Sequence, residues 1–170
     1  MIKLLAKSFF LALIILACSS GENNSSEDDC KYGSPTPIFS DTLRGVKSHQ
    51  FSLEKNNSEE EIKFDNDVDL TIYQSGCNSI RQDFHFTLQG DYSDKELEFW
   101  ILESVNQFNS LAQLHPNYQV YQLWGQAILE NGQDLKKGES RELDKGFYFK
   151  MDWIASESSA NLMLTLSENE

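Results

Sequence analysis

The sequence predicts an α+β fold in which a mostly antiparallel β-sheet carries one long amphipathic helix. Apolar side chains alternate with polar ones at a spacing of two through residues 51–88 and again through 147–166. This alternation is typical of antiparallel strands with one face in water. Between these regions, over 97–114, the spacing changes to three and four, which indicates a helix. A β-sandwich with the helix inserted is the alternative architecture.

The strands are expected to be joined by polar turns at 56–58 and 65–67, and residues 155–161 are expected to join the last two. The apolar positions of the first four strands are Phe51, Leu53, Ile62, Phe64, Val68, Leu70, Ile72, Phe84, Phe86 and Leu88. Those of the closing hairpin are Phe147, Phe149, Met151, Trp153, Leu162, Leu164 and Leu166. Each set should face the core.

The helix is expected over about residues 94–114, because Ser93 and Glu96 fit a capping box. His115 and the following proline should end it, with His115 as a cation favoured by the helix dipole. Residues 118–129 fit neither period. Asn131-Gly132 is a hairpin signal and favours a strand at Gln126–Glu130.

The first 29 residues have the composition of an export leader followed by a polar linker. Two lysines precede an unbroken apolar run at 9–17, which is shorter than the roughly 20 residues of a spanning helix. Ile15-Leu16-Ala17-Cys18 resembles the lipobox of bacterial lipoproteins. The resemblance implies cleavage before Cys18, diacylglycerol on its thiol and acylation of the new amino terminus, which together anchor a protein stably. An ordinary signal peptide with a chance cysteine is the alternative.

We therefore expect a signal peptide at 1–17, a lipidated Cys18 with a polar stalk at 18–37, and one α+β domain at 38–170. Ser19 stands where proteins of this class retained at the inner membrane usually have Asp, so the resemblance implies the outer membrane. The acidic residues 27–29 resemble surface-export signals of some lineages. A solvated spacer is the alternative, so the periplasmic face and the cell surface both remain open.

Cys30 and Cys77 form an even pair once Cys18 is lipidated, and an oxidising compartment favours a disulfide between them. Such a bond would close a loop of about 48 residues and contribute about 4 kcal/mol by chain entropy. A zinc or redox site is the alternative, but the chain has no Cys-x-x-Cys motif and no histidine at ligand spacing.

The charge balance restricts the partners. The chain has 27 acidic and 14 basic residues and a net charge of −13. Such a surface repels phosphate backbones and excludes nucleic acid as a partner. It favours a basic protein or another envelope component, beside the membrane itself through the lipid. The alternative is that acidity serves solubility alone.

No cofactor or metal site and no catalytic residue is predicted. Residues 65–69 begin like a calcium loop, but Leu70 and Gly76 stand where that loop needs Gly and Glu. Asp83 and His85 lie two apart on one strand face and could act as an orienter–base pair, although no nucleophile accompanies them. Six aromatic residues suggest either a binding strip or core: Trp100, Tyr118, Tyr121, Trp124, Tyr148 and Trp153.

Three functions follow from these observations. The first is a non-catalytic binding module, tethered to the envelope, that uses its sheet face or an aromatic patch. The second is an inhibitor of a basic hydrolase such as lysozyme, because opposite charge speeds encounter. The third is an envelope enzyme that uses His85 with Asp83.

Overall fold

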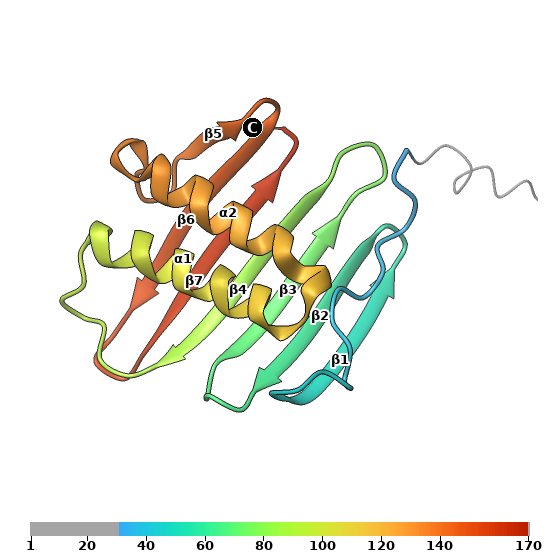
Figure 1. Ribbon diagram of the computed structural model, residues 1–170, viewed down its shortest axis with the longest axis horizontal. Helices are drawn as coiled ribbons and strands as arrows, with labels where there is room; N and C mark the ends of the chain where they lie inside the picture. Colours follow the sequence, from blue (N-terminus) through green and yellow to red (C-terminus); the bar gives the residue numbers. More distant parts are fainter. Residues whose placement is uncertain (1–30, 170) are drawn as a thin grey trace, which may run out of the picture.

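A computed structural model describes residues 31–169, so the leader, Cys18, most of the stalk and Cys30 lie outside the described residues. The described chain forms one seven-stranded antiparallel sheet with two helices packed on one of its faces (Figure 1). The predicted α+β class is confirmed, but the sheet carries two helices instead of the one long helix that the sequence predicts. The alternative of a sandwich is wrong for this part of the chain, because all seven strands belong to one hydrogen-bonded sheet. Among residues 31–169, no helix has the length and apolar character needed to cross a membrane.

The chain builds two meanders with a helical hairpin between them. The first comprises β1 (Val46–Glu54), β2 (Asn57–Phe64), β3 (Asp69–Ser75) and β4 (Arg81–Gln89). The hairpin comprises α1 (Leu97–Leu114) and α2 (Gln119–Glu130), with the 3-10 turns η1 (Pro116–Tyr118) and η2 (Gly132–Asp134) before and after α2. The second meander comprises β5 (Ser140–Asp144), β6 (Phe147–Ala155) and β7 (Ser159–Ser167). The strand order is β1-β2-β3-β4-β7-β6-β5, so β4 and β7 join the two meanders.

The core lies between the sheet and the two helices. Most apolar positions of the period-two pattern face it, and Ile72, Phe84, Phe86, Leu162 and Leu164 are fully buried. Each such side chain contributes about 1.5–3 kcal/mol by leaving water. The alternation predicted from the sequence is thus confirmed in β2, β3, β4, β6 and β7.

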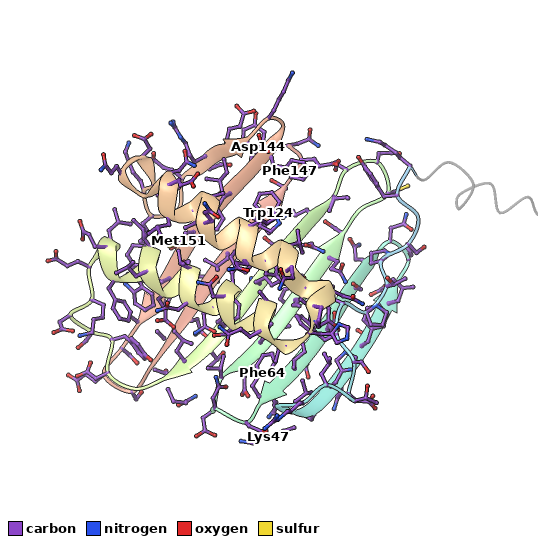
Figure 2. The ribbon with its side chains drawn as sticks, viewed as in Figure 1. Lys47, Phe64, Trp124, Asp144, Phe147 and Met151 are labelled. Carbon is purple, nitrogen blue, oxygen red and sulfur yellow. The ribbon has the colours of Figure 1, made fainter. Side chains whose placement is uncertain are left out.

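Aromatic rings join the helices to the sheet. Trp100 of α1 stacks on Trp153 of β6 at 5.4 Å between ring centroids. Trp124 of α2 lies beside Phe147 of β6 at the same separation, and Figure 2 shows the two together on the side of α2 that faces the second meander. None of the six aromatic residues considered as a binding strip is exposed. Five of them belong to the core or pack against it, whereas Tyr148 alternates onto the opposite face of β6, so the six residues do not form one exposed strip.

The start of α1 differs from the prediction. The helix begins at Leu97, and its N-cap Glu96 makes no side-chain capping bond. Ser93 bonds instead to the preceding turn, since its amide and hydroxyl both donate to Oδ1 of Asp91. Ser and Asp side chains compete for nearby backbone donors in this way, and here the local turn prevails over the capping box.

The predicted strand at Gln126–Glu130 is wrong, because α2 occupies residues 119–130. Asn131 ends this helix: its amide and its side-chain Nδ2 both donate to the carbonyl oxygen of Ala127. Tyr121, Gly125 and Ile128 are the buried residues of α2. Their spacing of four and three is helical, and Gly125 lies against α1, where a Cβ would be in ordinary contact at 3.5 Å from the Val105 carbonyl oxygen.

Residues 31–45, which we call the strap, run along the β1–β3 side of the sheet before β1 begins (Figure 1). The backbone amides of Ile38 and Phe39 donate to the two carboxylate oxygens of Glu60, each at 2.8 Å. Nε2 of His49 also lies 2.8 Å from Glu60 Oε1. Glu60 is completely buried, so this carboxylate fastens the strap to the sheet from within.

Candidate functional site

Within residues 31–169, no helix or second sheet covers the face of the sheet opposite the two helices (Figure 1). We call it the open face. It contains a shallow hollow of about 340 Å³, centred on β4 and β7. The hollow is lined by Tyr73, Arg81, Asp83, His85, Lys150, Asp152, Met163 and Thr165.

Strand register brings these side chains together from four strands. Asp83 of β4 lies opposite Tyr73 of β3 on one side and Thr165 of β7 on the other. His85 lies opposite Met163, and Met163 lies opposite Asp152 of β6. Side chains that face each other across antiparallel strands lie close enough to interact. The hollow is therefore a direct product of the pairing between the two meanders.

Asp83 is held by its neighbours. Nε and Nη2 of Arg81 donate to its two oxygens at 2.8 and 3.0 Å, and the Thr165 hydroxyl donates to Oδ1. Two parallel bonds from a guanidinium fix a carboxylate in both position and orientation. Among residues 31–169, no hydrogen bond joins Asp83 to His85. The sequence predicts correctly that the two share a strand face, but the oxygens of Asp83 are engaged by Arg81 and Thr165 instead.

His85 sits half-buried in the middle of the hollow. Its ring makes an edge contact with Tyr73 at 5.0 Å between centroids. Burial lowers the pKa of His85 below its usual value, and the Asp83 carboxylate partly opposes this shift. The imidazole is thus favoured in its neutral form, as an aromatic surface with one donor and one acceptor nitrogen.

We expect NMR titration of the full-length protein to place the His85 pKa below about 6.5. Asp83→Asn should lower it further, because the substitution removes the opposing negative charge. Since the folded state then binds protons less readily than the unfolded state, His85 should reduce stability as pH falls below about 6.5. His85→Gln identifies the resonance, and an unchanged or higher pKa in Asp83→Asn would contradict the electrostatic explanation.

One cation of the hollow has no partner. The Lys150 side chain makes no hydrogen bond or ion pair with any described residue, whereas Arg81 is paired with Asp83. Lys137 approaches Asp152 Oδ1 at 3.7 Å and lies over the Trp153 ring. The hollow therefore offers an aromatic edge, neutral donors and acceptors, and one free ammonium group. It suits recognition of a polar surface.

The remaining candidate residues have structural positions. Residues 65–67 form the turn between β2 and β3, where Asp67 has φ +60° and lies 3.4 Å from Lys47 Nζ. The expected polar turn is confirmed there. Throughout residues 31–169, no group of three or more His, Cys, Asp or Glu side chains is placed to hold a metal ion. His115 follows α1, and its Nδ1 accepts a bond from the Asn117 amide at 3.2 Å, so it caps η1 instead of acting as a helix cation.

The lipidation and disulfide predictions concern residues that are mostly outside the described part. Cys18 and Cys30 are both outside it. The Cys77 sulfur is held in a disulfide whose partner is not among the described residues. The Tyr32 amide donates to the Cys77 carbonyl oxygen at 3.1 Å, which brings the chain just after Cys30 to this loop. The Cys30–Cys77 pairing stays a prediction.

Glu60 is the important residue that the sequence analysis missed. It stands within three consecutive glutamates, which look like a solvated run. Its burial could have been predicted from the alternation of the strand, because Glu60 lies on the same side of the strand as Ile62 and Phe64, which face the core. Glu59 and Glu61 alternate onto the open face.

Comparison with known proteins adds no relative to this description: no protein-family model, no curated protein and no solved structure matches the chain.

Proposed function

We propose that this protein is a non-catalytic binding module, tethered by lipid on Cys18 to the outer membrane of the cell envelope, that contacts its partner through the open face. The tether and the address rest on the lipobox sequence alone. The use of the open face rests on the hollow that β3, β4, β6 and β7 form there.

The observation that carries the proposal is the content of this hollow. A one-sided antiparallel sheet is stable with its outer face in water, so an uncovered face alone carries little weight. Here, however, cross-strand neighbours bring the Tyr73 and His85 rings, the paired Asp83 and the free Lys150 into one concavity. Aromatic and arginine side chains surrounded by polar groups are common in protein interfaces.

Site-specific photo-crosslinking in cells tests the open face. A photoreactive amino acid at Ile154 samples the open face, where this side chain is 67% exposed. The matched control is Leu123 on the outer side of α2, which is 66% exposed. We expect a discrete adduct from position 154 and none of the same mass from position 123. Adducts that are equal at both positions, or present only at 123, would contradict the proposal.

Inhibition of a basic hydrolase is the second candidate. Glu59 and Glu61 lie on the open face, and neither makes an ion pair with a basic side chain among the described residues. Excess full-length protein should then slow lysozyme-catalysed cell-wall hydrolysis, and the doubly substituted Glu59→Gln, Glu61→Gln protein should do so less. Unchanged hydrolysis at excess protein rejects this function.

An enzyme that uses His85 with Asp83 is less well supported, because Arg81 and Thr165 occupy the Asp83 oxygens.

A further inference from the structure

The two edges of the sheet are built differently. β5, at one edge, has five residues, a register irregularity between Glu142 and Asp144, and three charged side chains. Short length, a bulge and charges are the devices that prevent an edge strand from pairing with another chain. β1, at the other edge, has nine residues, and its register with β2 is continuous from Ser48 to Glu54. β1 has a similar register irregularity only at its start, between Val46 and Ser48, so its regular edge is the longer of the two.

The outer edge of β1 is available for pairing. No backbone group among residues 31–169 hydrogen-bonds to it along 48–54, because β2 is its one neighbour and the strap joins it only through Val46. This stretch has no proline. On the helix side it presents Phe51, half-buried, and Leu53, which is 48% exposed. An edge of this kind accepts an extended segment through main-chain hydrogen bonds.

The open-face side of the same edge is acidic. Glu61 lies opposite Gln50, Glu59 lies opposite Ser52, and Glu54 belongs to β1 itself. None of the three carboxylates forms a salt bridge within the described part of the chain. The pKa of the Tyr73 hydroxyl on β3 is raised, first by burial and then by the negative charges of Glu59 and Glu61. Three carboxylates therefore lie beside β1 on this face, and they outnumber the one neighbouring cation on β2, Lys63, which lies opposite Ser48.

We propose that the outer edge of β1 binds an extended basic segment of a partner protein, which adds an eighth strand to the sheet. The apolar side chains of that segment lie beside Phe51 and Leu53. Its lysines and arginines, at alternate positions, point to the open face and reach Glu54, Glu59 and Glu61. Because side chains of a strand alternate between faces, one segment with period two satisfies both sides. The inference extends the proposed binding function from the open face to its edge and identifies the partner's chemistry.

Binding of a synthetic peptide to the full-length protein in detergent tests the inference. The probe is a fluorescent nine-residue peptide that alternates lysine with valine and is blocked at both ends. Two control peptides retain its charge: one is methylated on alternate backbone nitrogens, and the other groups all its valines together. We expect saturable binding of the probe, and about tenfold or greater loss with either control, because each removes the hydrogen bonds or the alternation that pairing requires.

Substitutions locate the site. Leu53→Lys and Ser52→Lys each place a cation on the β1 edge, at exposed positions on opposite sides of the strand, and each should weaken binding about tenfold by like-charge repulsion. Leu123→Lys changes an exposed leucine on α2 and should bind as the unsubstituted protein does. Circular dichroism checks the fold of each variant.

Three outcomes overturn the inference: no binding of the probe, equal binding of the methylated peptide, or full binding by both edge variants. Crosslinking from Ile154 tests the open face separately, so the two proposals can fail independently.

Discussion

Replacing Glu60 with leucine is expected to lower the free energy of unfolding by about 3–5 kcal/mol, which is the usual loss when one partner of a buried charged pair is removed. The carboxylate is fully buried and accepts from the Ile38 and Phe39 amides and from His49. Leucine leaves all three groups without an acceptor, and His49 is itself largely buried, with 13% of its side chain exposed. Each orphaned buried donor costs about 1–3 kcal/mol.

Urea unfolding of the full-length protein, followed by tryptophan fluorescence, measures this loss. Glu61→Leu is the matched control, since Glu61 is the next residue and is exposed on the open face. It should change stability by no more than about 0.5 kcal/mol. Glu60→Gln should fall between the two, because the amide keeps one oxygen as an acceptor. A Glu60→Leu protein within about 1 kcal/mol of the unsubstituted chain would show that the cluster does not hold the strap.

Replacing Cys77 with serine should lower the free energy of unfolding by about 4 kcal/mol if Cys77 is bonded to Cys30. The reason is that this bond closes a loop of about 48 residues in the unfolded chain. Reduction of the unsubstituted protein should cause the same loss. The reducing agent should have no further effect on Cys77→Ser. The measurement is urea unfolding with and without reductant, in a protein isolated with its disulfide intact.

The pairing itself is tested by combining substitutions. Cys30→Ser and Cys77→Ser should each have the full effect, and the double variant should be no less stable than either single variant, since one bond is lost in all three. Costs that add in the double variant would show that the two cysteines do not bond to each other. A Cys30→Ser protein that still loses stability on reduction would show that Cys77 bonds to another partner.

The strands β2, β3, β4, β6 and β7 were predictable because each follows one strong rule, whereas β5 has no alternation of apolar side chains and Leu53 of β1 is 48% exposed instead of facing the core. Alternation forces Phe84, Phe86 and Leu88 to one side whatever the strand order, so burial could be read from the sequence. α2 was not predictable for the converse reason. Val120, Leu123 and Leu129 are apolar but exposed, while Gly125 is buried without a side chain. These residues obscure the helical period, and tertiary packing decides the conformation.

The candidate site was predictable only within a strand. Asp83 and His85 share a face because they lie two residues apart, which the sequence shows. Lys150, Met163 and Thr165 join them through pairing between strands that are far apart along the chain. No local pattern determines that pairing. The same holds for the exposed edge, because β1 is an edge strand only by virtue of the strand order.

The Glu60 cluster has a consequence for how the strap keeps its register. The carboxylate binds peptide N–H groups, which every residue except proline carries. If the strap shifted by one residue so that Pro37 took the place of Ile38, the hydrogen bond from that position to Glu60 would be lost, because proline has no N–H group. If it slipped the opposite way, the Phe39 ring, 3% exposed and packed on Tyr118 and Tyr121, would leave its position. Glu60 and Phe39 together therefore resist slippage of the strap in either direction, so that a pull on the chain that precedes residue 31 would be resisted by the sheet.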